Sequence, residues 1–345
     1  MSKGARVMVW VAVAAVLLTA GAVQAAITID TVPVGNPGNT GEWSGESYGG
    51  YGPDRICGAV GYTYNIGKYE VTAGQYTAFL NAVADADAYG LYNTYMADPT
   101  NNYGCNIQRG GSSGSYTYSV DPNWANRPVN YVSFGDSARF ANWLHNGQPT
   151  GPQGLTTTED GAYFLNGATT DGQLLAVNRE SDCKWAITSE DEWYKAAYYK
   201  GGSTNAGYWD YPTATDSLPS NDLITPDPGN NANFYQNGYT LGSPYWRTEV
   251  GEFQNSDSPY GTFDQGGNVW EWNESVLYGS SRGLRGGSFI SNDYVLRASA
   301  RYSGNPTFGD GDVGFRVSEV PEPASLSILA LCLVGSLTRR KCRRR

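Results

Sequence analysis

Few side chains in this sequence could act as nucleophiles, general bases or transition-metal ligands. Its single histidine, His145, excludes a cluster of imidazoles for zinc or iron and leaves one candidate for a histidine base. The pattern Gly-x-Ser-x-Gly occurs around Ser47, Ser112 and Ser281. All three lie in Gly- and Ser-rich sequence, without the preceding strand and following helix of a nucleophile elbow. We therefore expect no zinc, no iron and no Ser-His-Asp hydrolase.

We predict three helices, each with one apolar face, as the elements that position the functional site. The capping residues that precede them are Thr72, Ser133 and Ser189. Each has Gln, Asp or Glu three positions later, as in a capping box. Glu190, Asp191 and Glu192 begin the third helix, where carboxylates suit the positive end of the helix dipole, so we interpret them as cap residues. Short strands are predicted at 62–71, 284–289, 296–299 and 314–317, and long loops follow residue 200.

Both ends of the chain carry sorting features rather than parts of the fold. Residues 1–25 have a basic start, an apolar run and small residues before a cleavage point, which predicts a signal peptide, with an uncleaved anchor as the alternative. Residues 320–345 contain Val-Pro-Glu-Pro, an apolar stretch at 324–338 and a basic end. This tail resembles the PEP-CTERM sorting signal, with a plain C-terminal anchor as the alternative. The resemblance implies an inner-membrane intermediate held through 324–338, recognition by an exosortase, and a final place at the cell surface or outside the cell.

The charge of the chain limits its partners. The 345 residues include 23 Lys and Arg against 33 Asp and Glu, a formal net charge of −10, and the basic tail lies outside the body of the protein. The exported body is therefore more acidic than the whole chain. Nucleic acid is excluded as a main partner because phosphate binding needs a basic surface, whereas divalent cations are attracted.

Three cysteines, Cys57, Cys105 and Cys183, remain in the body after the ends are removed. Export permits disulfides, and an odd number leaves at least one thiol unpaired. A Cys57–Cys105 bridge is the pairing we favour, since both residues lie in Gly- and Tyr-rich sequence, but the sequence does not determine the pairing.

The exported body is predicted to contain one domain at residues 60–318, which follows a Gly-, Ser- and Pro-rich segment at 26–59. Seven motifs in this domain, in their order along the chain, are similar to those of the formylglycine-generating enzyme and sulfatase-modifying-factor family. They are Ile66–Thr72, Arg127–Ser133, Ile187–Trp193, Asp264–Trp272, Leu284–Phe289, Arg297–Arg301 and Gly314–Val317. The resemblance implies an α+β fold of the C-type-lectin-like kind, with few helices, small antiparallel sheets and long loops.

The resemblance also implies an oxidase that binds copper through two cysteines, and this sequence departs from that pattern. A count back from Arg297 without gaps places the two family cysteines at Ser288 and Asp293, and no cysteine occurs between Cys183 and Cys332. Thiolates are the ligands that suit Cu(I). We therefore expect no copper and no formylglycine generation. An iron-dependent branch of the fold needs a histidine cluster, and the single histidine of this chain excludes that branch as well.

A calcium site is the metal site that the resemblance still implies. Its ligands would be the carboxylates of Asp264 and Glu271 and the carbonyls of Gly267 and Val269. Calcium prefers hard oxygen ligands, and a Gly-rich turn can direct such groups to one point. The alternative is a tight turn that packs its tryptophans in the core, with Glu271 in an ion pair.

Two function classes remain open. The first is a noncatalytic surface or matrix module that holds an exopolysaccharide or another exported protein. Its candidate stacking residues for sugar are the aromatics at 92–118 and 198–211, which could equally pack loops. The second is an enzyme of unassigned chemistry around Ser288, Asp293, Arg297 and Arg301. The four arginines 285, 297, 301 and 316 are expected to be buried hydrogen-bond hubs, with anion binding as the alternative.

Overall fold

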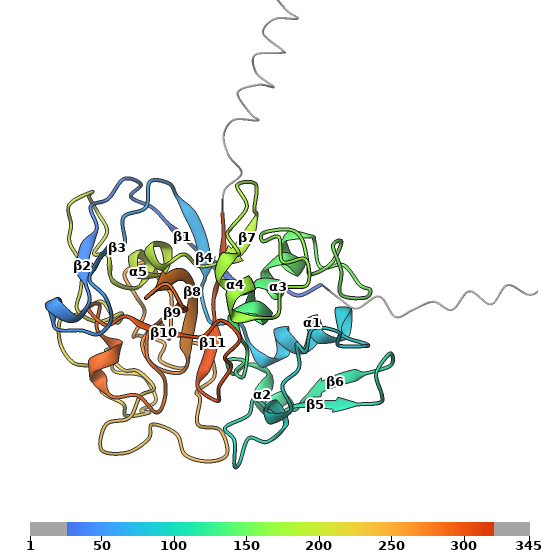
Figure 1. The fold of residues 1–345 in the computed structure, drawn as a ribbon. Coiled ribbons are helices and arrows are strands. Elements are labelled where there is room, and N and C mark those ends of the chain that lie inside the picture. Colours follow the sequence, from blue (N-terminus) through green and yellow to red (C-terminus); the bar gives the residue numbers. More distant parts are fainter. Residues whose placement is uncertain (1–25, 321–345) are drawn as a thin grey trace, which may run out of the picture.

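Residues 26–320 are described by the computed structural model, and their core is built on two four-stranded sheets (Figure 1). The first sheet is antiparallel throughout and has the order β1-β4-β12-β7. Its strands are β1 (Thr31–Val34), β4 (Tyr64–Gly67), β12 (Val317–Glu319) and β7 (Trp185–Ile187). In this sheet Ile66 lies between Val32 and Ser318, so segments far apart in the sequence meet.

The second sheet has the order β10-β9-β8-β11. Its strands are β10 (Tyr302–Gly304), β9 (Ser281–Arg285), β8 (Trp270–Leu277) and β11 (Val313–Phe315). The β8–β9 hairpin is antiparallel with a register shift between Asn273 and Val276, whereas β11 runs parallel to β8. Arg316 alone separates β11 from β12, so the chain passes from one sheet to the other at this fully buried residue.

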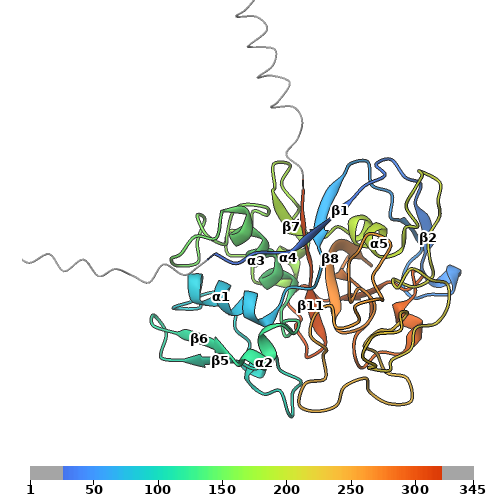
Figure 2. The same ribbon diagram turned by 180° about the vertical axis from the view of Figure 1, so that it is seen from behind.

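Two further strand pairs lie at opposite sides of the molecule in both views (Figures 1 and 2). One pair is β2 (Glu42–Ser44) with β3 (Arg55–Cys57), and the other is β5 (Ile107–Gly110) with β6 (Thr117–Val120). The first pair and β1 lie within residues 26–59, and they pack on the body of the domain.

The three predicted helices are confirmed, each with its capping box. They are α1 (Ala73–Val83), α3 (Phe134–His145) and α5 (Glu190–Tyr198). Two short helices that we did not predict are α2 (Pro122–Ala125) and α4 (Asp171–Ala176), and single-turn 3₁₀ helices are η1 (Glu46–Tyr48), η2 (Thr94–Ala97) and η3 (Asp293–Leu296). The Phe140 ring of α3 packs edge-on against Phe79 of α1 and Phe315 of β11, each at 5.3 Å, which joins the helices to the second sheet.

The strand predictions are only partly correct. The segment 284–289 forms strand only at its start, because β9 covers Ser281–Arg285, and 314–317 is divided between β11 and β12. The segment 296–299 is not a strand, since Leu296 ends η3 and the chain then turns. Strand β8 was read as a turn, although it is the longest described strand. The expected fold class, α+β with few helices, small sheets and long loops, is confirmed.

Within residues 26–320 no helix is long and apolar enough to cross a membrane. The predicted signal peptide at 1–25 and the apolar stretch at 324–338 lie outside the described residues.

Candidate functional site

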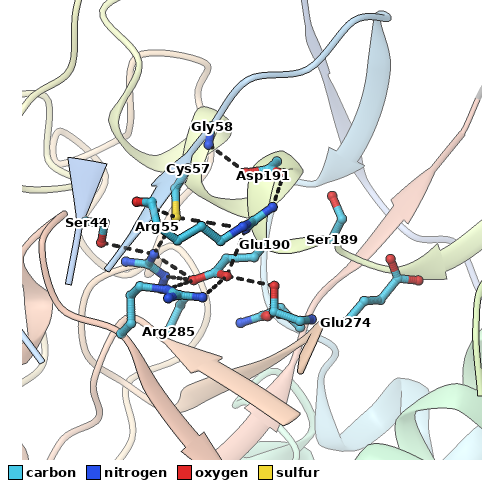
Figure 3. A network of polar contacts seen from close by, with 12 residues as sticks. Ser44, Arg55, Cys57, Gly58, Ser189, Glu190, Asp191, Glu274 and Arg285 are labelled. Atoms are coloured by element: carbon cyan, nitrogen blue, oxygen red, sulfur yellow. Dashed lines mark hydrogen bonds and ion pairs between the residues drawn. The ribbon is translucent and has the colours of Figure 1, made fainter. Parts of the chain in front are cut away.

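A buried carboxylate at the start of α5, Glu190, organises a network that includes Arg285 and Arg301, two of the four expected arginine hubs. The Glu190 side chain accepts hydrogen bonds from Arg285 Nη2 and Arg301 Nε, both at 2.7 Å to Oε1. Arg55 Nη1 lies 3.0 Å from Oε2, and Ser275 Oγ donates to the same oxygen at 2.7 Å. Burial alone would raise the pKa of Glu190, but the guanidinium groups hold it well below its usual value. Figure 3 shows Arg55 and Arg285 converging on this carboxylate.

Cys57 lies in the same network, and its thiol is buried and free. Its Sγ is 3.2 Å from Arg285 Nη2, and burial raises its pKa to about 11 despite that cation. The favoured Cys57–Cys105 bridge is wrong, because Cys57, Cys105 and Cys183 are all free and buried. Cys57 packs with α5, whereas Cys105 belongs to the main core with α1 and α3.

The acids of α5 do more than cap the helix. Glu192 closes the capping box by accepting from the Ser189 amide at 2.7 Å, as predicted. Its two oxygens also accept from Arg179 Nη1 and Nη2, each at 2.8 Å. Asp191 pairs with Arg55 at 2.5 Å and accepts from the Gly58 amide at 2.9 Å. The interpretation of these acids as cap residues was therefore incomplete, because Glu190 is also the carboxylate partner of Arg285 and Arg301, two of the four arginines expected to be hubs.

Those arginines differ in burial. Arg285, Arg301 and Arg316 are buried and bonded to carboxylates and main-chain carbonyls, which confirms the structural hub role. Arg297 is partly exposed, donates to Tyr211 Oη at 2.9 Å and lies 3.5 Å from Asp293. It is the member of the four that could reach a ligand.

The four expected calcium ligands lie on and beside the start of β8. Glu271 is fully buried, and its oxygens accept from Arg316 at 2.9 and 3.0 Å and from Trp193 Nε1 at 2.7 Å. Asp264 accepts from the Gly251 amide at 2.6 Å, and burial raises its pKa to about 6. Gly267 has φ +86° and its Cα faces the Asn233 carbonyl so closely that a Cβ would lie 2.2 Å from that oxygen. Val269 is buried.

These contacts give a mixed answer on whether calcium fits. A third acid, Glu70, is fully buried beside Asp264, and its Oε2 accepts no hydrogen bond and lies 3.9 Å from Arg316. Two buried carboxylates, Glu70 and Glu271, thus share the Arg316 guanidinium, with the partly buried Asp264 close by, and the surplus of negative charge suits a cation. Glu271, however, already has Arg316 as its partner. No group of three or more His, Cys, Asp or Glu side chains within 26–320 is arranged to hold a metal. Calcium stays a prediction.

The positions that correspond to the family cysteines in the ungapped count are both engaged. Ser288 is fully buried, and its Oγ donates to Asp312 Oδ2 at 2.8 Å and lies 3.0 Å from Ser291 Oγ. Asp293 begins η3 and pairs with Arg297 one turn later. The Ser288 hydroxyl is therefore held by loop side chains.

A pocket of about 660 Å³ opens next to Ser291 and Asp312. Its wall contains the Trp270 and Tyr302 rings, which stack at 5.1 Å with 25° between their planes. The remaining lining mixes apolar side chains with polar ones, one of them an acid, and comprises Leu284, Ile290, Asn292, Val295, Ser303, Gly304, Asn305, Phe308, Asp310 and Val313. Sequence reasoning missed this pocket, because Trp270 was considered only as core and Tyr302 carried no signal.

In the two segments considered for sugar stacking, 92–118 and 198–211, most tyrosine side chains are buried in the protein. Tyr92, Tyr118 and Tyr198 are buried, and their hydroxyls donate to main-chain carbonyls at 2.8–3.0 Å. The His145 side chain makes a structural hydrogen bond, because its Nδ1 accepts from the Lys184 amide at 3.0 Å.

Comparisons with known proteins agree with this architecture. A crystal structure of CarF is similar with a TM-score of 0.51 at 20% identity, covering 86% of this chain and 99% of that one. Treponema denticola variable protein 1 is similar with a TM-score of 0.52 at 19% identity, covering 87% and 100%. At such identity the likeness concerns the fold alone. No curated protein matches the sequence.

Two family models match the chain, and together they cover most of it. A PEP-CTERM protein-sorting motif matches residues 319–345, which implies recognition by exosortase sorting machinery and export to the cell surface. The model described as sulfatase-modifying factor enzyme 1-like domain matches residues 38–320. The chain therefore belongs to the family of the sulfatase-modifying factor enzyme 1-like domain.

Proposed function

We propose that this exported protein is a noncatalytic binding module that holds a segment of another exported protein in the pocket beside Ser291. The observation that carries the proposal is the state of Ser288. At this position, where the ungapped count places a family cysteine, there is a buried hydroxyl bonded to Asp312, and the sequence has no cysteine between Cys183 and Cys332. Copper-dependent oxidation needs soft ligands that this region lacks.

The lining of the pocket supports a polypeptide as the ligand. Apolar walls suit an apolar side chain, and the stacked Trp270 and Tyr302 rings give a flat surface of the kind that dominates binding hot spots. Asp310 and Asp312 add negative charge at one side, where a Lys or Arg side chain would be favoured. We therefore expect a peptide with a basic residue close to an apolar one.

An array of synthetic peptides tests this function with the full-length protein. Peptides that pair Leu or Phe with Arg should bind, and the same peptides with Glu in place of Arg should not. Tyr302→Ala removes a half-exposed ring of the pocket and should weaken binding at least about tenfold, which is about 1.4 kcal/mol. Tyr278→Ala, an exposed tyrosine outside the pocket, is the matched control and should bind as the wild type does.

Three results would contradict the proposal. Equal binding of Arg and Glu peptides, or no effect of Tyr302→Ala, would remove the pocket as the site. Oxygen consumption with a cysteine-containing peptide would show that the protein is an enzyme after all, the alternative function class.

A further inference from the structure

A second pocket, of about 730 Å³, lies on the side of the molecule formed by β2 and η1. It shares no lining residue with the pocket beside Ser291. Its wall brings together β2, η1, the loop at 205–210 and the turn at 297–299. A volume of this size lies within the range of small-molecule sites, about 300–1,000 Å³.

The main feature of this pocket is a stacked aromatic pair at the surface. The Trp43 and Tyr48 rings lie 5.3 Å apart and are almost parallel, at 8°. Both stay about half exposed, at 48% and 46%, although large aromatic side chains gain by burial. A flat apolar surface that the fold leaves open is available to a ligand.

The backbone around this pair is fixed by close approaches rather than by a flexible loop. Gly45 donates to the Ser299 carbonyl at 2.9 Å, and a Cβ at Gly50 would lie 1.9 Å from the same oxygen. The Ser44 hydroxyl donates to the Ala298 carbonyl at 2.8 Å, and Ala298 also accepts from Arg285 of the Glu190 network. The backbone that carries the rings is therefore held in place before any ligand arrives, which lowers the entropic cost of binding.

Polar groups of several kinds surround the aromatic pair. Glu42 accepts from Tyr194 Oη at 2.9 Å, and the exposed Asp210 carboxylate lies on the loop opposite. Asn205 bonds to Thr40 Oγ1 at 3.0 Å, and the partly exposed Arg297 adds a guanidinium. The pocket thus offers acceptors, an amide and donors within reach of one flat apolar face.

We propose that this pocket binds a neutral glycan. A pyranose ring presents an apolar C–H face that stacks on an indole, while its hydroxyls donate to carboxylates and accept from an amide or a guanidinium. Glu42 and Asp210 disfavour phosphate and acidic sugars, because like charges repel. Arg297 disfavours a cationic ligand in the same way. The site goes beyond the peptide pocket and does not depend on it.

Titration of the full-length protein with three probes tests the assignment. The probes are cellohexaose, an alginate hexasaccharide and choline, and the readouts are tryptophan fluorescence and calorimetry. Cellohexaose should bind, with at least a tenfold preference over the other two. Trp43→Ala should weaken that binding at least tenfold, and Trp43→Phe should restore part of it.

Matched controls separate this site from the peptide pocket and from unfolding. Tyr302→Ala should leave cellohexaose binding unchanged, and Trp43→Ala should leave peptide binding and the melting temperature unchanged, since the ring is half exposed. Failure of cellohexaose to bind would overturn the glycan assignment while the peptide function stands. Preferential binding of choline or alginate, or equal affinity of the Trp43→Ala variant, would overturn it as well.

Discussion

At the scale of single residues, this domain contains a large buried charge network centred on Glu190. Glu190 faces three guanidinium groups, and Glu192 faces a fourth. Buried ion pairs cost desolvation energy, and they hold together only when every partner is present. The network connects α5, β3, β9 and the turn after η3, so its role is to hold loops that have little regular structure.

Glu190→Gln should be the most damaging conservative substitution in the network. The amide keeps the shape of the side chain but leaves Arg55, Arg285 and Arg301 without their shared carboxylate. Breaking a buried pair in this way costs about 3–5 kcal/mol of unfolding free energy. Asp293→Asn, which breaks a partly exposed pair with Arg297, is the control and should cost about 0–1 kcal/mol. Denaturant unfolding measures both, and a loss below 1 kcal/mol for Glu190→Gln would show that the network is not structural.

At the scale of elements, what the sequence reveals depends on how local the determining contacts are. The helices at Thr72, Ser133 and Ser189 were predictable because their capping boxes lie within four residues. Strand β8 was not predicted: its partner β9 follows in a hairpin that pairs Leu277 with Ser281, but its other partner, the parallel β11, lies far along the chain at Val313–Phe315. The candidate sites were not predictable for the same reason, because their residues come from distant parts of the sequence. Nothing near Glu190 in the sequence indicates Arg285 or Arg301, and nothing near Trp43 indicates Asp210.

Helix α5 should lose stability in acid through Glu192. Burial tends to raise its pKa, but Arg179 and the Ser189 amide lower it to about 2 from 4.5. A carboxyl with a lower pKa in the folded state stabilises the protein above its unfolded pKa, and this contribution is lost as the pH falls from about 4.5 towards 2.

Urea unfolding of the wild type and Glu192→Gln at several pH values tests this expectation. At pH 7 the variant should be less stable by about 3 kcal/mol, and the difference should shrink as the pH is lowered through 4 to 3. A difference that stays constant with pH would mean that Glu192 stabilises the helix through packing and capping rather than through its charge.

At the scale of the whole molecule, long loops converge on the turn before β8. Gly251, Asn233 and Arg316 come from three separate segments and contact the region 264–271. The surplus of buried carboxylate there is the structural argument for a cation that would join these segments. Calcium at this turn would therefore stabilise the entire domain rather than one loop.

Chelation should lower the melting temperature of the full-length protein. A ligand present at a hundred times its dissociation constant adds about 2.7 kcal/mol, which corresponds to about 4 °C for a domain of this size. Asp264→Asn removes a proposed ligand and should abolish the chelator effect, whereas Asp257→Asn, at an exposed acid in a nearby loop, should keep it. If the wild type melts at the same temperature with and without chelator, calcium has no structural role here. Glu271 would then serve only as the buried partner of Arg316 and Trp193, and protons rather than a metal would offset the charges of Glu70 and Asp264.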